Sequence, residues 1–124
     1  MFRLKTIKER LYSLVFAWRG LSYLILREDS FKFQLFFSFL FIIAGFYFQI
    51  TNIEWFAQLG MMALVLSVEG LNSAVEKLAD YMQPNFDKHI GKIKDIAAGA
   101  VLVAGLFALA IGLIIYIPYF LDLI

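Results

Sequence analysis

Residues 31–50, FKFQLFFSFLFIIAGFYFQI, form an almost unbroken apolar run that contains eight phenylalanines. A helix needs about 20 apolar residues to cross a membrane, because each residue adds about 1.5 Å and the hydrocarbon core is about 30 Å thick. Lys32 lies at one end of the run, and the other polar residues within it are uncharged. The stretch therefore predicts a transmembrane helix, and it decides the class of fold.

The rest of the chain has the composition of a membrane protein. Of 124 residues, 62% are apolar and 17% are charged, whereas soluble domains have about 45–50% and about 25%. Two further stretches, 55–82 and 94–118, are also long enough to cross. Helical spacing continues through 55–82 beyond its apolar part, so we expect its end to project into water before a polar loop at 83–92. We predict an all-α integral membrane protein with three transmembrane helices.

Residues 2–29 form a different kind of segment. Their apolar side chains recur at alternating spacings of three and four, which places them on one face of a helix, opposite a basic face. That pattern is typical of an amphipathic helix lying in the membrane interface. A helix that packs on its own bundle fits the same spacing, and the two interpretations are compatible.

The basic residues predict the orientation. In a three-crossing topology all eleven lie on the side of the N-terminus, while the turn at 51–54 and the C-terminus carry none. Because basic loops stay in the cytoplasm, we expect a multi-pass protein with a cytoplasmic N-terminus. The eleven residues are Arg3, Lys5, Lys8, Arg10, Arg19, Arg27, Lys32, Lys77, Lys88, Lys92 and Lys94.

Small residues recur every four positions in the third crossing, at Ala100, Ala104, Ala108 and Gly112. Such spacing lets helix backbones approach closely in lipid. Because three helices make a thin bundle, we expect part of this surface to pack against other copies of the chain. The sequence leaves the number of copies open.

Several chemistries are excluded. The chain has no cysteine and one histidine, so disulfides, thiolate sites and a zinc cage are ruled out, and a metal must be held mainly by oxygen. No GxxxxGK[ST], GxGxxG or HExxH motif is present in the sequence. We expect His89 to be solvated in the polar loop.

One polar stripe carries the functional signal. Glu69, Asn72, Glu76 and Asp80 follow each other at spacings of three, four and four, on one face of the second crossing helix. Counted from Trp55 at the outer boundary, Glu69 lies about 21 Å into the core. An ionisable residue at that depth is costly and indicates function. For Asn72, a structural role in holding helices together is an equally open interpretation. For Glu76 and Asp80, the equally open interpretation is that they lie on a solvated helix end.

Two polar clusters lie near the stripe in this topology, at residues 27–30 (REDS) and at 92–95 (KIKD). Carboxylates and lysines together suit a nucleotide with magnesium, because carboxylate oxygens bind the ion and ammonium groups bind phosphates. A deeper carboxylate is placed to accept the proton of a lipid hydroxyl that attacks phosphorus. The arrangement predicts phosphoryl transfer at the boundary between water and lipid.

Two other classes of function remain in view. A small proton-coupled transporter or channel subunit also uses an intramembrane carboxylate such as Glu69. Such a protein usually has four crossings and a site near the midplane, whereas this stripe runs out of the membrane beside basic residues. A non-catalytic scaffold is the other alternative, and it leaves Glu69 unexplained.

The motifs resemble those of a known family, the small prokaryotic integral-membrane diacylglycerol kinases, which include the undecaprenol kinases. The block EGLNSAVEKLAD at 69–80 is similar to the family signature of Glu, two apolar positions, Asn, Ser or Thr, Ala, Ile or Val, Glu, and Asp four further on. KDIAAGAV at 94–101 is similar to the Lys-Asp segment that opens the last helix. WRGL at 18–21, with Glu28 and Phe31, is similar to the N-terminal pattern, so the likeness covers nearly the whole chain.

The resemblance implies an ATP- and Mg²⁺-dependent lipid kinase in the bacterial inner membrane. It implies a homotrimer whose active sites are shared between neighbouring chains, and no nucleic-acid partner. The lipid is diacylglycerol or undecaprenol, and the ending around Pro118 looks more like the undecaprenol kinases of Gram-positive bacteria. The family roles fall on Glu69 as catalytic base, Glu28 and Glu76 as nucleotide and magnesium ligands, Lys94 and Asp95 as nucleotide contacts, and Asn72 as the signature asparagine.

The chain departs from the family pattern at three positions, one of which is His89, offset from the family's usual loop histidine. Gly70 stands where a larger apolar residue is common. Glu9 stands where a nucleotide-contacting arginine is usual, and Arg10, one residue further, is the candidate substitute. The Arg10 side chain points about 100° away from that of Glu9, because neighbouring helical residues differ by this angle. The departures concern the nucleotide contacts rather than the reaction.

Overall fold

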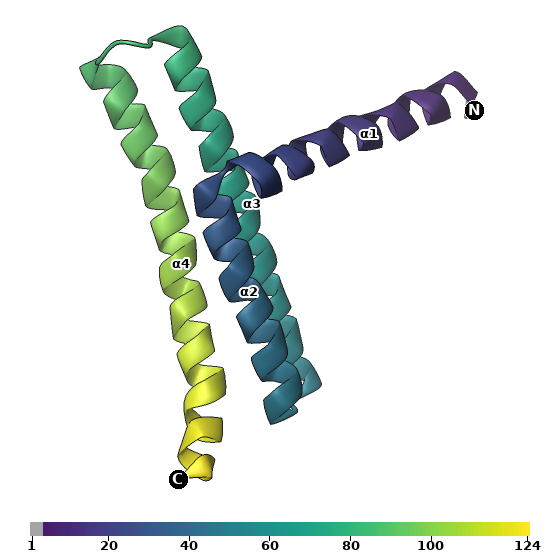
Figure 1. The fold of residues 1–124 in the computed structure, drawn as a ribbon, viewed down its shortest axis with the longest axis vertical. Coiled ribbons are helices and arrows are strands. Elements are labelled where there is room, and N and C mark those ends of the chain that lie inside the picture. The colour runs from purple at the N-terminus through teal and green to yellow at the C-terminus, as the bar shows by residue number, and fades with distance from the viewer. Residues whose placement is uncertain (1–3) are drawn as a thin grey trace.

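The computed structural model describes residues 4–124, and this range folds into four helices. They are α1 (Leu4–Arg27), α2 (Asp29–Phe48), α3 (Asn52–Met82) and α4 (Lys88–Leu123). In Figure 1, α2, α3 and α4 run alongside one another, and α1 projects away from them at a steep angle. The all-helical class is confirmed. Arg3 lies outside the described residues, as does the side chain of Lys5.

Three of the helices, α2, α3 and α4, are long and apolar enough to cross a membrane. With 20, 31 and 36 residues, they measure about 30, 46 and 54 Å along their axes. The two longer helices extend past the point where α1 joins α2, and a short loop connects their ends at the top of Figure 1. The three apolar helices of the sequence prediction are therefore present.

The junction between α1 and α2 lies earlier than the sequence predicted. Glu28 has φ −100° and ψ 109°, which is extended backbone, so α1 ends at Arg27 and the chain changes direction there. The expected helix over 2–29 was therefore too long at its C-terminal end. The first apolar helix also ends two residues before Ile50, because Gln49 adopts the left-handed conformation (φ 51°, ψ 53°) and its N–H caps the helix on the Phe46 carbonyl at 3.3 Å.

A capping box sets the start of α3. The Glu54 N–H donates to Thr51 Oγ1 at 3.2 Å, and the Thr51 N–H donates to Glu54 Oε1 at 2.9 Å. These reciprocal bonds satisfy two backbone donors that a helix start leaves free. The helix therefore begins at Asn52 and not at residue 55. Tyr119 of α4 donates a further hydrogen bond to Glu54, which joins α4 to this turn.

The polar loop is shorter than predicted, and α4 is longer at both ends. Asp87 caps α4 by accepting hydrogen bonds from the N–H groups of His89 at 2.9 Å and Ile90 at 3.1 Å. Residues 88–92 are therefore helical, and the expectation that His89 lies in a loop was wrong. At the other end α4 continues through Pro118 to Leu123. Pro118 has no backbone N–H, so the last turns of the helix lack one hydrogen bond.

The best packed part of the bundle lies at the end that holds the α2–α3 turn. Ile50, Ile115 and Tyr116 are buried together there. The Gln58 side-chain amide donates to the Phe41 carbonyl at 3.1 Å, and the Tyr116 hydroxyl contacts the same carbonyl at 3.1 Å and Gln58 Oε1. Because polar groups in lipid find few other partners, this network fixes the three long helices to one another.

The small-residue stripe of the third apolar run packs partly inside the chain. Ala104 is buried, and a Cβ at Gly112 would lie 3.6 Å from the ring of Phe41. Ala100, at the other end of the stripe, is exposed. Packing of this remaining part against another copy stays a prediction.

The contact between Gly45 of α2 and Trp55 of α3 predicts the effect of Gly45→Ala. A Cβ at this position would lie 2.6 Å from Trp55 Cη2, so the indole must shift, and we expect a loss of about 1–3 kcal/mol in stability. Thermal unfolding in detergent, followed by circular dichroism, measures the change. Gly60→Ala is the matched control, because no heavy atom lies within 4 Å of its Cβ. Equal midpoints for the two variants would contradict the close packing.

Candidate functional site

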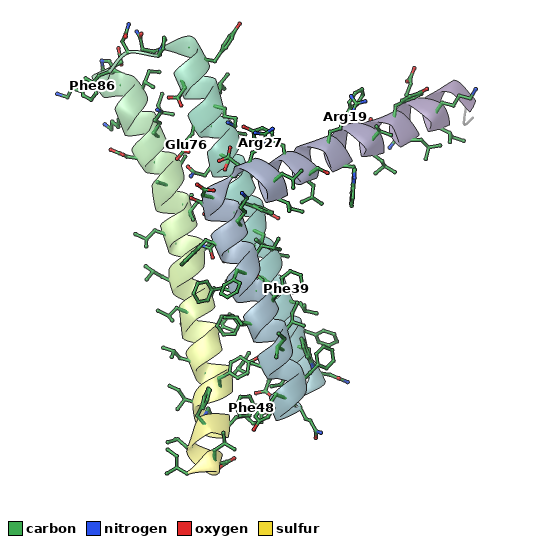
Figure 2. All side chains as sticks on the ribbon, in the orientation of Figure 1. Arg19, Arg27, Phe39, Phe48, Glu76 and Phe86 are labelled. Carbon is green, nitrogen blue, oxygen red and sulfur yellow. The ribbon has the colours of Figure 1, made fainter. Side chains whose placement is uncertain are left out.

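Glu69 lies on α3 and is buried, with 5% of its surface exposed. Ser73, one turn further along α3, is buried at 4%. Figure 2 places Arg27 and Glu76 at the level where α1 leaves the bundle, so the acidic part of α3 passes the junction of α1 and α2. The site is thus built where three helices meet.

Three carboxylates gather at this junction. Glu76 is on the same face of α3 as Glu69, about 10 Å further along the helix, and Glu28 lies against this part of α3 through its ion pair with Lys77. Glu28 comes from the break between α1 and α2, and its side chain is 19% exposed. Glu76 is exposed on α3 two turns after Glu69. The structure therefore places one buried and two more accessible carboxylates together within one chain.

Asn72 adds an unused oxygen to the group. Its side-chain amide donates to Glu76 Oε1 at 3.3 Å. Its Oδ1 atom is buried and has no hydrogen-bond partner among residues 4–124. Buried oxygens are normally paired, so this atom is available to accept a hydroxyl proton or to contact a cation.

Sequence reasoning missed a role for Lys77. Its Nζ atom lies 3.2 Å from Glu28 Oε1 and 4.8 Å from the centroid of the Tyr23 ring. The ammonium group therefore links α3 to α1 and to the α1–α2 break. A basic residue directly after Glu76 is the one signal in the sequence, but its partner 49 positions away follows from no helical spacing.

Lys94 and Asp95 lie near the start of α4. Lys94, near the start of α4, forms an ion pair with Asp80 of α3. Asp80 is about 16 Å beyond Glu69 along the α3 axis. Asp95 is exposed beside this pair. These residues therefore lie toward the α3–α4 loop from the three carboxylates.

Arg10 is remote from the carboxylates of its own chain. It is exposed on α1, about 27 Å along the helix from Glu28. Figure 1 shows that this part of α1 points away from the bundle. The structure therefore does not bring Arg10 to the site within one chain.

An apolar groove of about 610 Å³ lies between α1, α2 and α3. Gly70, the neighbour of Glu69, forms part of its wall. A Cβ at Gly70 would lie 3.0 Å from Leu24 Cδ1, so the glycine lets α1 approach α3 beside the buried carboxylate. This contact explains why a small residue stands at position 70. Other residues of the wall are Leu21, Ile25, Leu35, Leu66 and Leu71.

Within residues 4–124, no group of three or more His, Cys, Asp or Glu is arranged to hold a metal by itself. Magnesium does not need such a group, because it is usually bound by one or two carboxylates together with substrate phosphates and water. Glu28, Glu76 and the free oxygen of Asn72 have the chemistry for that mode.

The chain matches the family described as prokaryotic diacylglycerol kinase over residues 15–116. It is 32% identical over 106 residues to an undecaprenol kinase of Bacillus subtilis, covering 86% of this chain and 86% of that protein. It is 32% identical over 114 residues to a diacylglycerol kinase of Synechocystis, covering 91% of this chain and 65% of that protein.

Together with the three long apolar helices, these matches identify the chain as a multi-pass membrane lipid kinase. The chain is a member of the prokaryotic diacylglycerol kinase family. Kinases of this kind carry out ATP-dependent phosphoryl transfer. The alternative of a transporter or channel subunit is not favoured by these relatives.

Proposed function

We propose that this protein transfers the γ-phosphate of ATP to the hydroxyl of a membrane lipid, with Glu69 as the base. The observation that carries the proposal is the position of Glu69, which is buried beside an apolar groove and two turns before the exposed Glu76 on the same helix face, at the junction that also holds Glu28. A lipid chain in the groove and a nucleotide on the accessible side would meet at this side chain.

The membrane position follows from the helices and the charges. The α1–α2 break marks the level at which α1 leaves the bundle (Figure 1), and we place the cytoplasmic surface there. The basic residues lie on this side, which supports a cytoplasmic N-terminus in a bacterial inner membrane. Leu11, Leu14 and Trp18 of α1 are 57%, 65% and 69% exposed, which supports a surface helix whose apolar face enters the lipid.

The lipid substrate enters by its apolar part. The groove wall is formed almost entirely by apolar side chains, and Gly70 connects it to Glu69. The hydroxyl of a diacylglycerol or of undecaprenol has the chemistry to reach the carboxylate from this side. Undecaprenol is the first lipid to test, because the relative matched over 86% of both chains is an undecaprenol kinase.

The chemical step needs one proton acceptor on the protein. Glu69 accepts the proton of the lipid hydroxyl while that oxygen forms a bond to the γ-phosphorus. The bond between the γ-phosphorus and its bridging oxygen breaks, and ADP leaves with the electron pair. The groove keeps bulk water from the reacting hydroxyl, which favours transfer to the lipid over hydrolysis of ATP.

The nucleotide occupies the accessible side of Glu69. Glu28 and Glu76, with Asn72 Oδ1, would hold Mg²⁺. When bound, the ion would neutralise part of the phosphate charge. Lys94 and Asp95, near the start of α4, would contact the rest of the nucleotide. Lys94 would exchange its present partner Asp80 for a phosphate.

A homotrimer completes the proposal. Most side chains of α1 are exposed in one chain, and Arg10 is about 27 Å from its own Glu28. A neighbouring chain would cover part of this surface and bring an Arg10 to the site. Sites shared between chains then require Arg10 of one copy and Glu69 of another.

The test of function is transfer of labelled γ-phosphate from Mg-ATP to diacylglycerol or undecaprenol in mixed micelles. Because a general base contributes about 10²–10⁴-fold, we expect Glu69→Gln to lower kcat by at least about 100-fold with little change in nucleotide binding. Asp122→Asn, an exposed carboxylate change near the far end of α4, is the control and should retain normal turnover. Normal turnover of Glu69→Gln would exclude Glu69 as the base, and no transfer to either lipid by folded protein would contradict the substrate class.

Mixed oligomers test the shared site. We expect purified Arg10→Ala and Glu69→Gln, each weakly active alone, to regain activity when they are mixed, since one chain supplies Arg10 and the other Glu69. Glu28→Gln mixed with Glu69→Gln should regain none, because both residues serve the same site of one chain. Activity regained from Glu28→Gln with Glu69→Gln, but not from Arg10→Ala with Glu69→Gln, would contradict this proposal. It would mean that Glu28, and not Arg10, comes from the neighbouring chain.

A further inference from the structure

The Lys77–Glu28 ion pair gives Glu28 a cation before any metal is bound. Lys77 Nζ lies 3.2 Å from Glu28 Oε1, and the side chains are 53% and 19% exposed. Glu28 thus has limited access to solvent, and the ammonium group takes up part of its accessible side.

A second cation at Glu28 has to compete with this ammonium group. Two positive charges held on one carboxylate repel each other, because the dielectric near a protein surface screens them less than bulk water does. Binding of a divalent ion to Glu28 therefore requires Lys77 to move away. The cost of that movement lowers the affinity of the site for free metal.

The Lys77 ammonium group has two alternative partners when it leaves Glu28. Its ammonium group already lies over the Tyr23 ring at 4.8 Å, and a cation is stabilised there without a carboxylate. Its flexible four-carbon stem is half exposed, and its ammonium group lies at the accessible side of Glu28. Nucleotide phosphates that arrive on this side offer the ammonium group a stronger partner.

We propose that Lys77 is an exchangeable counterion of Glu28 that couples metal binding to nucleotide binding. Without nucleotide it occupies Glu28 and weakens binding of free divalent metal. With nucleotide it turns to the phosphates and leaves Glu28 free for the ion. Lys77 is a positioning residue, and the inference rests on the proposed role of Glu28 and Glu76 as metal-binding carboxylates.

The first experiment measures Mn²⁺ binding to the purified full-length protein without nucleotide, by electron paramagnetic resonance. Partly exposed ion pairs change an equilibrium by up to about fivefold. We therefore expect Lys77→Met to bind Mn²⁺ about fivefold more tightly than wild type. Lys77→Arg keeps the charge and should bind Mn²⁺ as weakly as wild type or more weakly, because arginine holds a carboxylate with two hydrogen bonds.

Two further variants serve as controls. Lys32→Met removes a nearby charge whose partner is Asp29, at 3.8 Å, and not Glu28; its Mn²⁺ affinity should match that of wild type. In the double variant Lys77→Met with Glu28→Gln, the gain should disappear, because the carboxylate that Lys77 occupies is no longer charged.

The second experiment repeats the titration with a non-hydrolysable ATP analogue. The analogue should raise the Mn²⁺ affinity of wild type more than that of Lys77→Met, by the same factor of about five, because the coupling is reciprocal. Equal enhancement in both proteins would overturn the coupling.

The outcomes distinguish failure of the proposed metal role of Glu28 from failure of the inference about Lys77. If Glu28→Gln alone leaves Mn²⁺ binding unchanged, the proposed metal role of Glu28 fails. If Glu28→Gln weakens Mn²⁺ binding while Lys77→Met has wild-type affinity, the metal role stands and the inference about Lys77 is wrong. Should Lys77→Met not fold, tighter Mn²⁺ binding by Lys77→Arg than by wild type would overturn the inference on its own.

Discussion

The burial of the Glu69 carboxylate at the junction of α1, α2 and α3 is the constraint on which the rest of the site depends. An ionisable side chain with 5% exposure on a membrane-spanning helix is costly. The local structure maintains it: Gly70 lets Leu24 close over this part of α3, and the break at Glu28 brings a second carboxylate near it. A site of this kind has an apolar side and a polar side, which is what transfer between a lipid and a nucleotide requires.

One end of the bundle holds the helices together, and the proposed reaction takes place at the other. At the α2–α3 turn, the capping box and the hydrogen bonds among Gln58, Tyr116 and the Phe41 carbonyl hold the helices together. At the opposite end α3 and α4 extend past α1, and their contacts there include the ion pair between Lys94 and Asp80. Ion pairs exposed to water contribute little to stability, so this end can exchange its partners for a nucleotide.

Much of this arrangement is predictable from the sequence, because it depends on periodicity. The apolar runs define three long helices, and the spacing of Glu69, Asn72 and Glu76 places them on one face. The helix starts were missed because single side chains, Thr51 and Asp87, set them through local hydrogen bonds. The contact of Lys77 with Glu28 joins two elements that no spacing relates. The distance of Arg10 from the carboxylates follows from the direction of α1, which one extended residue determines.

The proposed function requires Glu28, Glu69 and Glu76 to lie at one metal-nucleotide site. Carboxyl-carbon labelling of all glutamates, followed by nuclear magnetic resonance with Mn²⁺ and a non-hydrolysable ATP analogue, tests it most directly. Glu54 at the α3 cap is the internal control, because it lies about 22 Å along α3 from Glu69. The account predicts that the three site signals broaden together while the signal of Glu54 stays sharp. A Glu69 signal that stays sharp while those of Glu28 and Glu76 broaden would contradict it.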